Sequence, residues 1–72
     1  METINRCYRV ERREINYLRW IIESYDGMAV MRTIDPYDAT IELRIAPGCE
    51  TLVEELLESL QKYEGIKMIS KE

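Results

Sequence analysis

Two carboxylates stand close together in the stretch IDPYDATIEL, where Asp35 and Asp38 flank Pro36 and Tyr37. Such a pair could hold a divalent ion or act as a general acid and base. The neighbouring residues supply none of the other ligands that an ion would need. Pro36 presets the backbone angle for the second position of a turn, and an aspartate before it can accept backbone N–H groups. The stretch therefore predicts a turn with Asp35 as a structural acceptor, and a carboxylate site is the alternative.

The rest of the chain lacks the residue patterns of common active sites. It contains no histidine, and its cysteines, Cys7 and Cys49, are too far apart to form a CxxC motif. No serine stands in a nucleophile elbow, and no glycine-rich loop could cradle a phosphate. The sequence therefore predicts a protein that is not an enzyme and that has no metal or other cofactor.

Composition and length predict one small domain that spans residues 1–72. Of these residues 46% are hydrophobic and 33% are charged, which is typical of a soluble globular chain. A core of this size supplies only about 3–5 kcal/mol of net stability, so a second copy would help to stabilise it. The sequence therefore favours a homodimer.

Charge and hydropathy argue against nucleic-acid and membrane partners. The net charge is −4, whereas nonspecific binding to either partner needs clustered lysine and arginine. No segment approaches the roughly 20 apolar residues that span a bilayer, and the N-terminus lacks the apolar run of a signal peptide. We therefore expect a cytoplasmic protein without nucleic-acid or membrane binding. The charge is uneven, because every arginine precedes residue 45 and four glutamates follow within residues 50–58.

Hydrophobic periodicity predicts six elements. Alternation indicates strands, and apolar residues at helical spacing indicate helices. The predicted elements are a strand over 4–10, a helix over 13–25, strands over 28–34 and 39–46, a helix between Gly48 and Gly65, and a strand over 66–70. Gly27 is placed to cap the first helix in a left-handed conformation, and Gly65 ends the second.

This order predicts a ferredoxin-like α+β sandwich. Two strand-helix-strand units in series give a four-stranded antiparallel sheet with two helices on one face. The short connection over residues 35–38 makes the two middle strands a hairpin. In the second of these strands, Ile41 and Leu43 would face the helices.

The other face of the sheet would be open, and it mixes apolar and charged side chains. The residues predicted there are Met28, Val30, Arg32, Ile34, Thr40, Glu42 and Arg44. Arg32 and Glu42 could pair across the strands. Such a mixture is typical of a protein interface or a ligand shelf, with an ordinary half-solvated sheet as the alternative.

The single tryptophan is predicted to point outward. On a helical wheel Trp20 lies far from the apolar stripe, and Tyr17 precedes it by one turn. Exposed Tyr and Trp pairs are common at interface hot spots. We therefore predict an intersubunit contact here, and the alternative is that the long side chain of Arg13 or Arg19 covers the rings.

Two arginines stand where the first strand meets the first helix. Arg12 and Arg13 add positive charge to a helix N-terminus, which already favours an anion. The segment also lacks a Ser, Thr, Asp or Asn cap. An anionic ligand would satisfy both arginines, and the alternative is that Glu11 and Glu14 do so.

Three short segments, residues 9–13, 25–27 and 32–36, resemble a small bacterial family of about this length that is known only as a domain of unknown function. Their order is an arginine-rich strand end, a YDG helix exit and an RTIDP hairpin. The resemblance covers nearly the whole chain. It implies the same fold and a bacterial cytoplasmic protein, and it supplies no catalytic residue.

Two other groups of proteins share the predicted topology. The element order resembles ACT domains, which bind amino acids and similar metabolites near the first strand-helix loop, here residues 11–13. RNA-binding domains of this topology stack bases on exposed aromatic residues, and the strand ATIELRIA offers none. We therefore keep two hypotheses: a homodimerising protein-interaction module that uses Tyr17, Trp20, Val30, Arg32 and Glu42, and an ACT-like sensor that binds a small anion through Arg12 and Arg13.

Overall fold

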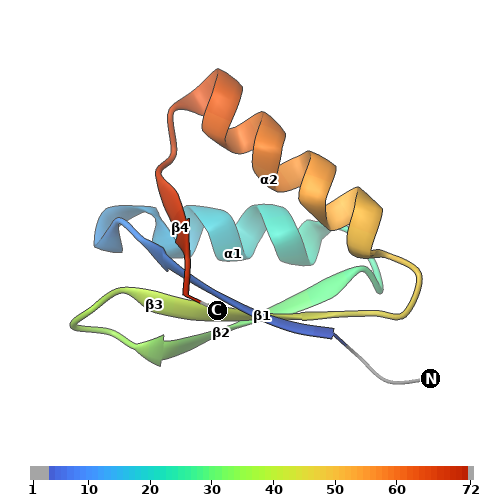
Figure 1. Ribbon diagram of the computed structural model, residues 1–72, viewed down its shortest axis with the longest axis horizontal. Coiled ribbons are helices and arrows are strands. Elements are labelled where there is room, and N and C mark those ends of the chain that lie inside the picture. Colours follow the sequence, from blue (N-terminus) through green and yellow to red (C-terminus); the bar gives the residue numbers. More distant parts are fainter. Residues whose placement is uncertain (1–3, 72) are drawn as a thin grey trace.

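The chain folds as strand, helix, strand, strand, helix, strand, in the order that the sequence predicts (Figure 1). The computed structural model describes residues 4–71, and the ends of the predicted domain, residues 1–3 and 72, lie outside the described residues. The elements are β1 (Ile4–Val10), α1 (Ile15–Ser24), β2 (Ala29–Asp35), β3 (Thr40–Ile45), α2 (Glu50–Glu64) and β4 (Met68–Ser70).

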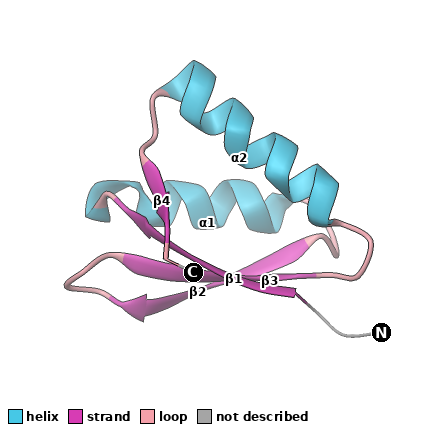
Figure 2. Cartoon of the chain, in the orientation of Figure 1, coloured by secondary structure: helices cyan, strands magenta, loops and turns pink. Residues whose placement is uncertain are grey.

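The four strands form one antiparallel sheet in the order β2-β3-β1-β4. Both helices lie on the same face of this sheet, and in this view α2 is inclined to α1 and lies farther from the sheet (Figure 2). The opposite face carries no helix among residues 4–71. The predicted ferredoxin-like sandwich is therefore confirmed.

The core lies between the sheet and the helices. Ile41, Leu43 and Ile45 project from β3 into this layer and are fully buried, as are Leu18 and Ile22 of α1. Val53, Leu57 and Leu60 complete the layer from α2. Because each buried leucine or isoleucine contributes about 1.5–3 kcal/mol, these side chains fix which face of the sheet is covered.

The ends of α1 differ from the prediction. A single 3-10 turn, Arg12–Glu14, precedes the α-helix, because without a Ser, Thr, Asp or Asn cap the first turn tightens to satisfy its own backbone groups. Gly27 is left-handed, with φ of 73°, but the C-cap is Tyr25 and the glycine lies later in the turn. Gly65, with φ of 68°, caps α2 as predicted.

Two predicted strand ends are wrong. Met28 was placed on the open face, yet β2 begins at Ala29 and Met28 is only 6% exposed. It belongs to the preceding turn, where strand alternation does not apply, and its side chain joins the core. The last strand is also shorter than predicted, since Ile66 donates its backbone N–H to Leu60 at the end of α2 and is buried.

Candidate interaction surfaces

The carboxylates of the hairpin turn serve the fold. Oδ1 of Asp35 accepts the backbone N–H groups of Tyr37, at 2.9 Å, and of Asp38, at 3.2 Å. This confirms the predicted structural acceptor. Ala39 follows with a left-handed φ of 57°, and its carbonyl accepts the N–H of Val10. The turn therefore joins the hairpin to the central strand β1.

Asp38 is the centre of a small ionic cluster at this end of the sheet. Its Oδ2 accepts the hydroxyl of Thr40 at 2.9 Å and lies 3.5 Å from Nζ of Lys71, while Oδ1 lies 3.2 Å from Nη2 of Arg9. The Thr40 hydrogen bond, followed by the charges of Arg9 and Lys71, outweighs partial desolvation and lowers the pKa of Asp38. Residues of β1 and β3, together with Lys71 just after β4, thus stabilise the ionised carboxylate of Asp38.

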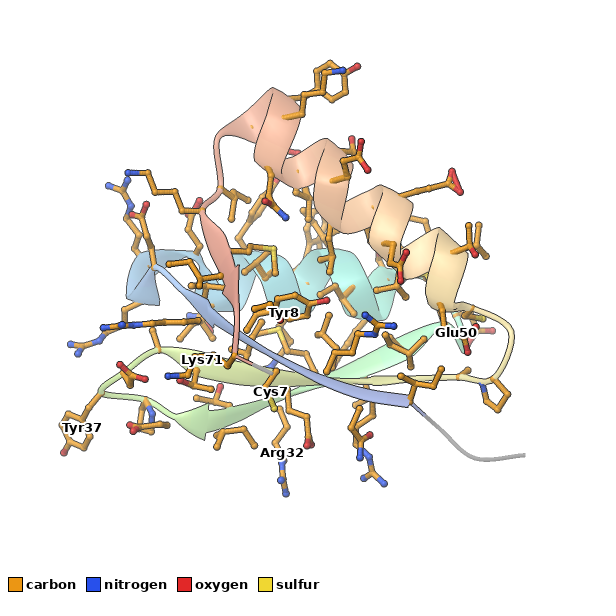
Figure 3. The ribbon with its side chains drawn as sticks, in the orientation of Figure 1. Cys7, Tyr8, Arg32, Tyr37, Glu50 and Lys71 are labelled. Carbon is orange, nitrogen blue, oxygen red and sulfur yellow. The ribbon has the colours of Figure 1, made fainter. Side chains whose placement is uncertain are left out.

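The open face of the sheet, defined here as the side away from the helices, carries the predicted mixture of side chains. Val30 of β2 is exposed on it, and Ile69 of β4 is exposed beside Arg9 in the register. Ile34 is also exposed, but it lies in a bulge where the register of β2 shifts between Thr33 and Asp35. Nη2 of Arg32 lies 3.5 Å from Oε1 of Glu42, so the predicted cross-strand pair is confirmed. Figure 3 shows Arg32 projecting away from the helices.

Arg44 differs from its neighbours on the open face. It is exposed on β3, between Val30 of β2 and Asn5 of β1. Within residues 4–71 it has no ion-pair partner. It also borders a hollow of about 510 Å³ at the corner where α1 leads into β2, together with Tyr25 and Val30. The guanidinium of Arg44 is therefore available to a partner molecule.

The outer side of α1 presents the predicted aromatic pair. Trp20 is 70% exposed and Tyr17 is 38% exposed. Their rings stack with centroids 6.4 Å apart and planes inclined by 27°. The Tyr17 hydroxyl donates a hydrogen bond of 2.5 Å to Glu64 at the end of α2, and this bond is the main cause that raises the pKa of Tyr17. The tyrosine is therefore anchored, and the indole beside it faces solvent.

The arginines that could have covered Trp20 bind elsewhere. Nη2 of Arg19 donates to the Thr33 hydroxyl on β2 at 3.0 Å. Nε of Arg13 lies 3.0 Å from Oε2 of Glu11. Neither guanidinium is thus committed to the indole, which agrees with the large exposed area of Trp20.

The predicted anion site at the start of α1 has internal partners. Arg13 pairs with Glu11, which was one of the alternatives. Arg12 donates from Nη2 to the carbonyl of Tyr37 in the hairpin turn at 3.0 Å. The two guanidinium groups therefore bind different segments of the chain and do not share one ligand position through these contacts.

Two features of the structure were missed by sequence reasoning. The cluster around Asp38 joins residues that are far apart in the chain, and the sequence analysis assigned neither Arg9 nor Lys71 to a site. Arg6 was not singled out, yet it lies on the helix-facing side of β1, where Nη2 is 3.5 Å from Oε1 of Glu54. Its position in the alternation, between Ile4 and Tyr8, was the available signal.

Residues 4–71 contain no group of three His, Cys, Asp or Glu side chains that could hold a metal ion. Over the same range, neither helix has the length and apolarity that a membrane crossing requires.

Comparison with known proteins identifies a family. A family model described as a domain of unknown function (DUF4911) matches residues 8–63. This match confirms the resemblance to a small family of that kind. No curated protein and no solved structure matches the chain.

Proposed function

We propose that the chain, which belongs to the DUF4911 family of domains of unknown function, is a non-enzymatic protein-interaction module that forms a homodimer. The observation that carries this proposal is Trp20, which is 70% exposed and stacked on Tyr17. Following the family resemblance in the sequence, we assign it to the bacterial cytoplasm.

The aromatic pair has the properties of an interface anchor. Tryptophan and tyrosine dominate binding energies at protein interfaces, where their large rings leave water. The hydrogen bond from Tyr17 to Glu64 fixes one ring before binding, so less side-chain entropy is lost on association. The opposite side of α1 is occupied by core residues such as Leu18 and Ile22, so the exposed indole of Trp20 is left open to a contact outside the domain.

The charges at the ends of α1 are compatible with contact with a second copy. Arg12 and Arg13 precede the helix together with Glu11 and Glu14, so this end has no net charge, while Glu23 and Asp26 lie at the other end. Two such helices packed antiparallel about a two-fold axis at Trp20 would place the acidic end of each opposite the neutral end of the other. A two-fold contact of this kind uses the same patch on both copies.

The ACT-like sensor has less support. Its proposed ligand groups, Arg12 and Arg13, are engaged with Tyr37 and Glu11. An anion would have to replace both contacts before it could bind there.

Sedimentation equilibrium of the wild type and of Trp20→Ala tests the homodimer. We expect the wild type to sediment at twice the chain mass of 8.6 kDa and Trp20→Ala to sediment as a monomer with unchanged circular dichroism. Tyr37→Ala is the matched control, because this aromatic side chain is also exposed but lies at the tip of the hairpin (Figure 3). A monomeric wild type, or a Trp20→Ala variant that remains dimeric, would refute the proposal.

A further inference from the structure

We propose that the open face of the sheet docks an acidic amphipathic helix of a different protein. The inference deepens the proposed interaction function and rests on it, but it concerns a surface other than the outer side of α1. Three properties of this face support it: exposed apolar side chains, cations that are more exposed than the carboxylate of Glu42, and the spacing of the arginines.

Apolar side chains line both edges of the open face. On β2, Val30 is 58% exposed and Ile34 is also exposed, while Ile69 on β4 is 62% exposed. On the central strands between them, Thr40 is buried and Cys7 and Glu42 are half-buried, whereas Arg9 and Arg44 are exposed. A helix laid across this face would bring apolar side chains against both edges.

The charges of this face favour an acidic partner. The cations that reach it are Arg9, Arg32, Arg44 and Lys71. The Glu42 side chain is only 16% exposed, whereas that of Arg32 is 66% exposed. At the Arg32–Glu42 pair an approaching molecule therefore meets the guanidinium before the carboxylate. Arg9 and Lys71 are paired with Asp38, whereas Arg44 has no ion-pair partner within the described residues. In a chain of net charge −4, this concentration of cations points to a partner that carries carboxylates.

Other occupants fit this face less well. Two copies packed with their open faces together would bring like cations against each other, which is unfavourable. Single-stranded RNA needs aromatic side chains on which its bases can stack, and the positions of β2 and β3 on this face, from Val30 to Ile34 and from Thr40 to Arg44, include none.

The sheet register gives the spacing that the partner should match. Arg32 lies opposite Glu42, and Arg44 is two residues further along β3, so Arg32 and Arg44 are diagonal neighbours about 7–8 Å apart at the backbone. Arg32 on β2 is aligned with Glu42 on β3 and Cys7 on β1, and Arg9 is two residues beyond Cys7 on β1. From the spacing of strands and residues in a sheet, the backbones of Arg9 and Arg32 are about 12 Å apart. Carboxylates at positions i and i+7 of a helix are about 10.5 Å apart along its axis. A helix with that spacing can therefore reach Arg9 and Arg32 together, with its carboxylates replacing the contacts that these arginines make with Asp38 and Glu42.

Fluorescence anisotropy with a synthetic helix tests the proposal on the full chain. The probe is a fluorescein-labelled peptide of about 20 residues, with leucines on one face and glutamates at i and i+7 beside them. We expect binding to the wild type that weakens with added salt, and a loss of about tenfold in affinity for Arg44→Glu. Lys62→Glu is the matched control, since it makes the same charge change on exposed α2 and should retain wild-type affinity.

Several results would overturn the proposal. These are absence of probe binding to the wild type, equal affinities of the Arg44→Glu and Lys62→Glu variants, and equal binding of a probe with glutamines in place of glutamates. Tighter binding of labelled single-stranded RNA, lost in Arg44→Glu, would assign the face to nucleic acid instead. The Trp20→Ala variant separates the two proposals: we expect it to lose the dimer and keep the probe, so each proposal can fail without the other.

Discussion

Arg6 offers a sharp test of how this domain is stabilised, because it introduces a charge into the layer between sheet and helices. It projects from the helix-facing side of β1, opposite Leu43 of β3. Its Nε–H is buried without a hydrogen-bond partner within residues 4–71. Its one ion-pair contact in that range is the 3.5 Å approach of Nη2 to Oε1 of Glu54, whose side chain is 57% exposed.

Replacement of Arg6 by methionine should therefore stabilise the protein. A buried donor without a partner costs about 1–3 kcal/mol, whereas an exposed ion pair contributes at most about 1 kcal/mol. Methionine keeps an unbranched apolar stem of similar length and fills irregular space well. We expect Arg6→Met to raise the free energy of unfolding by about 1 kcal/mol, which in a domain of this size raises Tm by about 4–8 °C.

Urea unfolding followed by far-ultraviolet circular dichroism measures this change. Tryptophan fluorescence would be a poor probe, because Trp20 is already exposed in the folded protein. The midpoint should rise while the m-value stays constant. Glu54→Gln is the control, since it removes the ion pair alone and should lower stability by less than about 1 kcal/mol. If Arg6→Met is less stable than both the wild type and Glu54→Gln, the reasoning about the buried Nε–H is wrong.

Two further predictions concern the hairpin turn. Asp35→Ala removes the acceptor of two backbone N–H groups and should lower the free energy of unfolding by about 1 kcal/mol in thermal unfolding. Asp35→Asn keeps an acceptor oxygen and should lose less stability. Equal losses for the two variants would contradict this role of Asp35. The second prediction concerns pH: the folded state lowers the pKa of Asp38 below its ordinary value of 3.8, so the stability that Asp38 contributes is present above about pH 4 and is lost as the pH falls through its folded pKa. Stability curves across this acidic range should therefore fall more steeply for the wild type than for Asp38→Asn, and parallel curves would contradict the assignment.

The fold could be predicted because its signals are local and repeated. Alternation in β3 identified the buried face of Ile41 and Leu43, and the open face then fixed the Arg32 and Glu42 pair. The turn at Asp35 was likewise encoded within a few residues. Errors arose where a local pattern ends, as at Met28, because alternation does not reveal at which residue a strand begins.

The candidate sites were harder to predict because their partners come from distant segments. Arg12 is held by the carbonyl of Tyr37, 25 residues away in the chain, and Tyr17 by Glu64 of the other helix. Neither contact can be read from spacing. The sequence could place Trp20 on the outside of α1, since a helical wheel needs only the helix itself.

Binding surfaces in this domain are best sought among groups that folding leaves without a partner. Arg12 and Arg13 were predicted to bind an anion, yet the fold already uses both. Arg44 was predicted only to lie on the open face, yet it is exposed there without an ion-pair partner within the described residues. A guanidinium bound within the domain must give up that contact to bind a ligand, and one in solvent gives up only water. The same comparison favours Trp20 over Tyr17 as the group whose exposed area a partner would cover, because the Tyr17 hydroxyl is already bound to Glu64.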